Sequence, residues 1–211
     1  MASVRLVEAH GPALVLGSTQ AADVVDAAAA ARHGVSVVRR RSGGGAVLVG
    51  TGDVVWVDVF VPADDTLWDR DVGRATHWLG RAWTDALGAL GTEAVWHDGP
   101  LVKGPWSSLV CFAGLGPGEV RAVAPSPFGG KVVGISQRRT RAGTHFQCAA
   151  LLKWDPAATL GVLRLDDAER SRAGRDLEDV AVGLAQVAGG RKVPPSVSAV
   201  EDAFVRRLST L

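Results

Sequence analysis

The chain has 211 residues, of which 47% are hydrophobic, so it can bury one substantial core and we expect a single domain over residues 1–211. Its 23 Lys and Arg residues and 22 Asp and Glu residues leave a net charge of +1, which argues against a global field that would recruit nucleic acid or an anionic membrane. The sequence contains no apolar run of about 18 residues and no signal-peptide pattern after Met1, and we therefore expect a cytoplasmic protein.

The first third of the chain predicts strands and one helix. Short apolar runs at 4–9 and 12–17 suit two strands, and the alanine-rich segment 19–33 suits a helix. Residues 36–40 form a further predicted strand. Between 53 and 61, valine alternates with other residues, which predicts a strand with one valine-lined face.

The rest of the chain mixes helices with strands. Apolar residues recur at helical spacing from Asp69 to Leu90, which predicts a long amphipathic helix. Beyond Pro156 the chain turns helical, and a capping box of Ser198 and Glu201 is predicted to start the last helix. The intervening apolar runs suit successive antiparallel strands at 108–113, 118–123, 130–137 and 146–154. The expected fold class is α+β, with a mixed, largely antiparallel sheet packed by helices.

The stretch RRRSGGGAV, residues 39–47, has the composition of an anion-binding loop. Arginine supplies fixed charge and forked donors, and adjacent glycines let backbone N–H groups turn toward a ligand. The stretch is neither a P-loop nor a dinucleotide fingerprint, because no Gly-Lys-Ser/Thr and no helix follow it. From these residues alone, a phosphate- or carboxylate-binding turn and a plain hairpin with solvated arginines are equally good interpretations.

Three segments in order resemble one known family. RRRSGGGAVL at 39–48, GGKVVGISQRRTRAG at 129–143 and QCAALLKWD at 147–155 are similar to the ligand loop, the lysine segment and the following strand of the lipoate-protein ligase A family. The resemblance implies the catalytic-domain fold that biotin and lipoate ligases share with class II synthetases. It also implies that lipoate or octanoate is activated with ATP and Mg²⁺ to an acyl-adenylate. The acyl group then passes to a lysine of a lipoyl-carrier domain, of the 2-oxoacid dehydrogenase E2 or glycine cleavage H protein type.

The resemblance assigns roles residue by residue. The resemblance implies that Lys131 is the catalytic residue, between the acyl carbonyl and the phosphate, where it would stabilise negative charge. If the sequence had no glycine loop, a surface lysine on an edge strand would be the better interpretation of Lys131. The residues implied to bind nucleotide and acyl chain are Arg40, Arg41, Ser42, Gly43, Gly44, Gly45, Ala46, Val47, Leu48, Asp98, Gly134 and Ser136. Val47, Trp56 or Val133 would line an acyl tunnel, although core packing explains each equally well. Asp98 is also explained by the turn chemistry of HDGP.

The chain also departs from the family pattern. Family ligases continue the glycine loop with His-Asp and Gly-Asn, where this chain reads LVGTGD, and Gln147-Cys148 replaces a His-Gly. The family's C-terminal accessory domain and the helix before its second strand are not expected within residues 1–211. A separate accessory subunit is therefore an expected partner, beside the carrier domain.

Cys111 supports a different activity on the same fold. It precedes Lys131 by twenty residues, as in octanoyltransferases of this fold, where a cysteine accepts the acyl group and no ATP is needed. The competing interpretation is a small buried hydrophobe within VCFA. A third hypothesis is a binding module that holds lipoate or an acyl-adenylate without turnover. His97, Cys111, His145 and Cys148 lack metal-site spacing, so no metal site is predicted.

Overall fold

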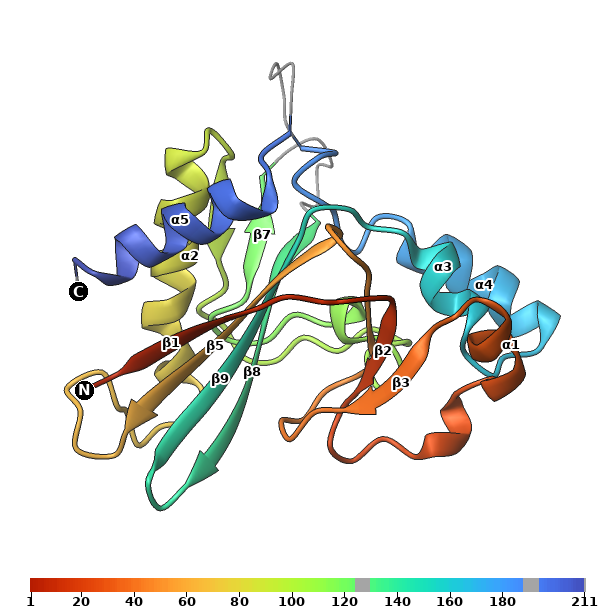
Figure 1. Ribbon diagram of the computed structural model, residues 1–211, viewed down its shortest axis with the longest axis horizontal. Helices are drawn as coiled ribbons and strands as arrows, with labels where there is room; N and C mark the ends of the chain where they lie inside the picture. Colours follow the sequence, from red (N-terminus) through yellow and green to blue (C-terminus); the bar gives the residue numbers. More distant parts are fainter. Residues whose placement is uncertain (124–129, 188–193, 211) are drawn as a thin grey trace.

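The computed structural model describes residues 1–123, 130–187 and 194–210, and its main feature is a six-stranded antiparallel sheet (Figure 1). The sheet order is β1-β5-β9-β8-β7-β6. Its strands are β1 (Ser3–Val7), β5 (Val54–Pro62), β9 (Gly143–Leu151), β8 (Lys131–Thr140), β7 (Val120–Ala122) and β6 (Ala94–Trp96). The α+β class and the antiparallel pairing are thus confirmed.

A second, three-stranded sheet makes the fold mixed. β2 (Ala13–Leu16) pairs in parallel with β3 (Ser36–Arg39) and antiparallel with β4 (Val47–Val49), so the order is β3-β2-β4. The segment from 40 to 46 connects β3 to β4 and contains the three glycines. The strand that directly follows the glycines, β4, therefore belongs to the second sheet, whereas the valine strand predicted at 53–61 is β5 of the large one.

Helices cover one face of the six-stranded sheet (Figure 1). α2 (His77–Ala89) and α5 (Val197–Leu208) pack on the buried valine face of β5, where Val55, Val57, Val59 and Val61 are at most 2% exposed. The rings of Trp83 and Phe204 stack with centroids 3.8 Å apart and join the two helices. The opposite face of the sheet is left for the second sheet and the glycine loop.

A second core lies beneath the small sheet. Leu14, Leu16 and Val47 pack there with Leu160 and Leu177, and these side chains are at most 5% exposed. The helices on this side are α1 (Ala27–Arg32), α3 (Pro156–Gly161) and α4 (Asp167–Leu177). The two cores place β4 and the glycine loop firmly against the larger sheet.

Two predicted helices are shorter than the sequence pattern indicated. In the segment 19–33, Val25 forms a strand-like bridge with Leu163, so only a 3-10 turn at Ala22–Val24 precedes α1. In the segment 69–90, the Asp69 carboxylate accepts from the N–H of Asp71, and the Asp71 carboxylate accepts from the N–H of Arg74. These local turns compete with helix formation, and regular α-helix begins only at His77.

Two other predictions about local structure are wrong. The run 108–113 is not a strand, because it makes a single bridge from Val110 to Ala46 and then turns into a 3-10 helix at Cys111–Ala113. The last helix is capped by Ser196 and not by Ser198, since the Ser196 hydroxyl accepts from the N–H of Ala199. Ser198 lies inside the first turn.

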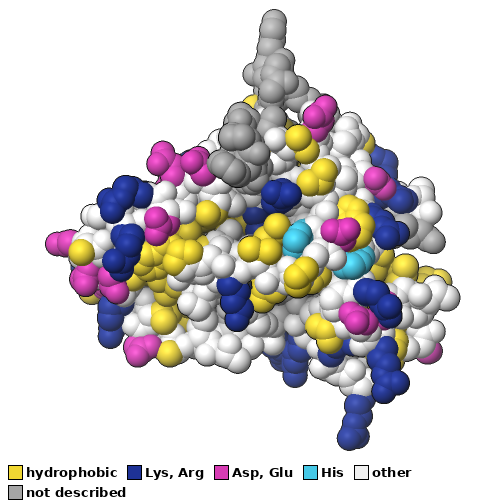
Figure 2. All heavy atoms as spheres, turned by 180° about the vertical axis from the view of Figure 1, so that it is seen from behind, with side chains coloured by type: hydrophobic (Ala, Val, Ile, Leu, Met, Phe, Trp, Pro, Cys, Tyr) yellow, Lys and Arg dark blue, Asp and Glu magenta, His cyan; other side chains and the backbone are white. Residues whose placement is uncertain are grey.

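The surface opposite to the view of Figure 1 carries both charge signs interspersed, without a continuous patch of one sign (Figure 2). None of the helices in the described ranges is long and apolar enough to cross a membrane.

Candidate active site

The glycine loop, Cys111 and Lys131 line one cavity of about 680 Å³. Gly43, Gly44 and Gly45 form one wall, and the opposite wall contains Ser136 of β8. The cavity lies between the two sheets, which is why residues nearly 100 positions apart in the sequence meet in it. Its volume falls in the range of small-molecule sites.

The loop needs glycine because other backbone segments approach it too closely for a side chain. Gly44 has φ +99°, a conformation that L side chains rarely adopt, and a Cβ at Gly17 would collide with the carbonyl oxygen of Gly44. A Cβ at Gly45 would lie 2.7 Å from the backbone nitrogen of Cys111. The loop therefore packs directly on the backbone that carries Cys111.

Arg40 holds this loop from within. It is 6% exposed, and its guanidinium donates to the carbonyls of Gly43 at 2.7 Å, Gly45 at 2.9 Å and Val15 at 3.2 Å. The same guanidinium lies 3.8 Å from the Cys111 sulfur. The structure thus places Arg40 as a support of the loop and as a cation beside the thiol. Its predicted contact with a nucleotide stays a prediction.

Ser42 links the loop to the large sheet. Its hydroxyl, 2% exposed, lies 2.8 Å from the Ser136 hydroxyl and donates to Gln147 Oε1 at 2.6 Å. The Gln147 amide in turn donates to Asp58 at 3.3 Å. Gln147, which replaces the family's histidine, is therefore part of a polar chain that fixes the loop on β9 and β8.

Lys131 is buried in a cage of acceptors. It is 2% exposed, and its ammonium donates to the carbonyls of Cys111 at 3.0 Å and Gly114 at 2.9 Å. It also pairs with Glu119 Oε2 at 2.7 Å and lies 5.0 Å from the centre of the Phe112 ring. These three oxygen atoms can take all three ammonium protons. The interpretation as an exposed edge-strand lysine is wrong.

Glu119 is a site residue that the sequence reasoning did not identify. It is 6% exposed, and besides Lys131 it accepts from the N–H of Gly116 at 2.6 Å and of Ile135 at 3.0 Å. The sequence did contain a signal for Glu119, namely an acidic residue beside the apolar strand residues of GEVRAV. If that strand is buried, the carboxylate needs a cation as its partner. Gly134 leaves room for the pair, since a Cβ there would lie 3.4 Å from Lys131 Cε.

The two cysteines differ sharply. Cys111 is partly exposed and lines the cavity, so it is not the buried hydrophobe that its apolar neighbours suggested. Cys148 is fully buried in the core under α2, and this burial raises the pKa of its thiol to about 12. Only Cys111 of this pair is placed to react with a ligand in the cavity.

The remaining predicted residues are spread over other surfaces. Ala46, Val47 and Leu48 line a separate cavity of about 180 Å³, and Arg41 and Ser42 line a third. Asp98 is exposed in its turn and is absent from the residues that line these described cavities. The turn interpretation of HDGP is therefore the one that its position favours.

The predicted acyl tunnel is closed in this structure. Val47 and Trp56 share only a void of about 10 Å³, which has room for no more than one water, while Val47 also lines the cavity of about 180 Å³ and Val133 belongs to the core under α2. Within the described ranges, no group of three or more His, Cys, Asp or Glu side chains is arranged to hold a metal ion. The space beside Cys111 that has room for an acyl chain is the 680 Å³ cavity.

Fold and cavity together define a domain with a cavity of small-molecule size between a glycine-rich loop and a lysine-bearing strand. The chain belongs to the family of the lipoyl protein ligase A/B catalytic domain, whose model matches residues 2–209. The sequence-based resemblance is thereby confirmed. No curated protein matches the chain significantly.

Solved structures agree over nearly the whole chain. A bi-partite lipoate protein ligase from Thermoplasma acidophilum, solved in work that includes its E2 lipoyl domain, shares 19% identity at a TM-score of 0.77, covering 99% of this chain and 70% of that one. Another structure from this organism, a putative lipoate protein ligase with bound lipoic acid, shares 21% identity at a TM-score of 0.71, with coverages of 99% and 72%. A lipoate-protein ligase A bound with ATP also shares 21% identity, at a TM-score of 0.67 and the same coverages. At such identities the likeness shows the shared fold.

Proposed function

We propose that this chain transfers a medium-length acyl group, such as octanoyl or lipoyl, to a lysine of a lipoyl-carrier domain through a thioester on Cys111. The observation that carries the proposal is the single cavity shared by the Cys111 thiol, the glycine loop and Lys131. The Arg40 guanidinium lies 3.8 Å from the sulfur and so holds the side chain of Cys111 beside the glycine loop. Cys111 is thus the nucleophile that this cavity offers within the described residues.

The reaction consists of two balanced exchanges. The Cys111 thiol gives up its proton and attacks the carbonyl carbon of an acyl thioester donor, the bond to the donor sulfur breaks, and the departing sulfur takes up a proton, so that the donor leaves as a thiol. The free amine of the carrier lysine then attacks the Cys111 thioester, gives up one proton and forms an amide, and the thiol of Cys111 is released. Both steps develop negative charge on the carbonyl oxygen, which the loop N–H groups would stabilise. Lys131, whose protons are already taken, would hold the backbone carbonyl of Cys111 in place.

Lys131 is less well placed for the nucleotide-dependent route. Its protons already bind two carbonyl oxygens and Glu119, and a phosphate would have to displace one of these partners. The guanidinium of Arg40 is similarly occupied by carbonyl oxygens. In this arrangement the side chains do not fit a magnesium-bound nucleotide at Lys131.

The ATP-dependent ligase is the second candidate. It is supported by the family match, and a lipoate-protein ligase A of the same fold has been solved bound with ATP. In this candidate, Lys131 would leave Glu119 to meet the adenylate, and a separate subunit would complete the reaction, as in the bi-partite relative. A binding module without turnover is the remaining possibility.

Mass spectrometry of a lipoyl-carrier domain distinguishes these candidates. The carrier is incubated with the protein and an octanoyl thioester donor, or with octanoate, ATP and Mg²⁺. The proposal predicts carrier acylation from the thioester without ATP, its loss in Cys111→Ser, and its retention in Cys148→Ala. Acylation that needs ATP and survives Cys111→Ser would establish the ligase, and no acylation in either arm would favour the binding module.

A further inference from the structure

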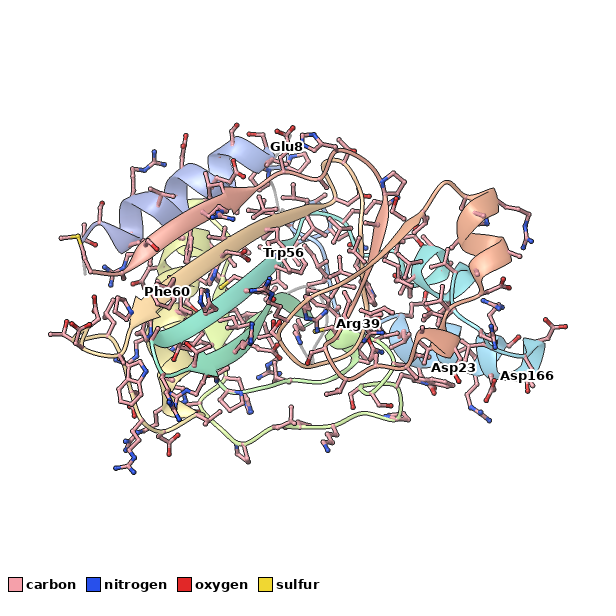
Figure 3. All side chains as sticks on the ribbon, turned by 60° about the horizontal axis from the view of Figure 1, so that its bottom comes forward. Glu8, Asp23, Arg39, Trp56, Phe60 and Asp166 are labelled. Carbon is pink, nitrogen blue, oxygen red and sulfur yellow. The ribbon has the colours of Figure 1, made fainter. Side chains whose placement is uncertain are left out.

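Two exposed residues, Leu101 and Lys103, line the 680 Å³ cavity that contains Cys111, so they lie where it opens to solvent. Leu101 is 56% exposed although its side chain is large and apolar. In Figure 3 the light green loop around residue 100 runs along the lower edge of the view, toward the turn that carries Asp23. The mouth of the cavity is therefore open to a partner from this side.

The backbone beside this mouth is fixed. The N–H of Val102 donates to the Leu115 carbonyl at 2.8 Å, and the N–H of Leu115 donates back to the Val102 carbonyl at 2.9 Å. Side chains alternate along extended backbone, so Leu101 and Lys103 lie on one side and Val102 on the other. This alternation agrees with the cavity lining, which contains the first two and not the third.

Lys103 is the uncompensated charge of this cavity. The other charged residues of its lining are Lys131 and Glu119, which pair with each other at 2.7 Å. Lys103 makes no hydrogen bond, ion pair or ring contact with any residue that the structure describes. The mouth thus combines one free positive charge with the apolar side chain of Leu101.

The proposed transfer brings a second positive charge to this mouth. The target lysine of a carrier domain is an ammonium at neutral pH, and Lys103 repels it as it approaches. A carboxylate next to the target lysine offsets this repulsion, because it can pair with Lys103 while the lysine enters the cavity. An acceptor without such a carboxylate meets the repulsion alone.

We propose that Lys103 and Leu101 select the acceptor, and that they recognise a carrier domain whose target lysine has an acidic neighbour. The carboxylate pairs with Lys103, and an apolar side chain of the same turn packs on Leu101. The inference rests on the acyl transfer proposed above and names the kind of acceptor that this cavity takes. Lys103 performs no chemical step and acts before the acyl group moves.

Three versions of one lipoyl-carrier domain test the proposal, with Glu, Gln or Lys directly before the target lysine. An octanoyl thioester donor is kept in excess, and kcat/KM for each carrier is measured by mass spectrometry. We expect kcat/KM to fall about threefold from the Glu carrier to the Gln carrier, and about tenfold from the Glu carrier to the Lys carrier. High salt should reduce both differences, since the charges involved are exposed.

Charge variants of the protein separate this role from a structural one. Lys103→Ala should remove the preference among the carriers, and Lys103→Glu should reverse it, because a carboxylate at the mouth attracts the Lys carrier. The matched control is Lys153→Ala, which removes another exposed lysine outside this cavity lining and should keep the preference of wild type. Thermal melting of each variant verifies folding.

Equal acylation of the three carriers by wild type, or a preference that survives Lys103→Ala, would overturn the proposal. Failure of the proposed function is seen separately, because the octanoyl adduct on Cys111 is measured before any carrier is added. If this adduct does not form, the comparison is made with octanoate, ATP and Mg²⁺, and the order of the carriers decides in the same way. No acylation in either arm would overturn both proposals.

Discussion

Lys131 and Glu119 form a buried ion pair that holds the wall of the 680 Å³ cavity in which Cys111 lies. Their side chains are 3% and 7% exposed, and their contacts join β8 to the segment from Cys111 to Gly116. A buried ion pair is costly to form but far more costly to break on one side. The backbone of Cys111 therefore depends on both partners of the pair.

Replacing Glu119 by Gln should lower the free energy of unfolding by about 3 kcal/mol, because the Lys131 ammonium then stays buried without a counter-charge. Chemical denaturation measures the loss. Glu93→Gln, at an exposed carboxylate, is the matched control and should change stability by less than about 0.5 kcal/mol. The double variant Glu119→Gln/Lys131→Met should recover much of the loss. If Glu119→Gln lowered the free energy of unfolding no more than Glu93→Gln does, the ion pair would not contribute to stability.

Cys148 gives a prediction for alkaline pH. Burial raises the pKa of its thiol from 9.0 to about 12, so the folded state keeps its proton where the unfolded chain releases it. Its contribution to stability is complete below pH 9 and is lost as pH rises toward 12. Between pH 8 and pH 10, denaturation should show wild type losing about 1.4 kcal/mol more than Cys148→Ala. Parallel pH dependence of the two proteins would refute this.

At the scale of elements, sequence patterns fixed the strands better than the helix starts. Period-two valines identified β5 because one face is fully buried, and the register on β9 follows from the same alternation. The start of a helix depends on a single side-chain hydrogen bond, such as the one that the N–H of Ala199 donates to the Ser196 hydroxyl. A similar residue a few positions away can form the same kind of bond, so the sequence alone does not show which one caps the helix. Cys111–Ala113 became a 3-10 helix because the glycine loop occupies the space beside it.

The capping assignment of α5 can be tested with two serines. Ser196→Ala should cost about 1 kcal/mol of unfolding free energy, because the first turn loses its side-chain acceptor. Ser198→Ala, the matched control inside the first turn, should cost much less. Urea denaturation of both variants measures the difference, and a larger loss for Ser198→Ala would support the capping box predicted from the sequence.

At the scale of the whole molecule, the sequence allowed the fold class, the glycine loop, Cys111 and Lys131 to be recognised. It did not show that the loop, the thiol and the lysine line one cavity. The strand order places β5 between β1 and β9, so neighbours in space are distant in the chain. Glu119 reaches Lys131 and the N–H of Ile135 only through this arrangement. Propensity and alternation describe one strand at a time, and they do not say which strands enclose a cavity between two sheets.

The two-sheet arrangement also assigns separate roles to the arginines of RRRSGGGAV. Arg39 and Arg40 hold backbone carbonyls, whereas Arg41 is exposed at a separate cavity of about 800 Å³. The three glycines line the cavity that contains Cys111. The motif therefore combines arginines that support the loop with glycines that face the cavity.

The central claim is that Cys111 carries the acyl group, and intact-protein mass spectrometry tests it most directly. The protein is mixed with an octanoyl thioester donor, without carrier domain or ATP, and quenched in acid. We expect one octanoyl adduct, which hydroxylamine removes and which peptide mapping places on Cys111. The Cys111→Ser variant should lack this adduct, and the Cys148→Ala variant should retain it. An unmodified protein under these conditions, beside a carrier domain that becomes acylated only with ATP, would contradict the account.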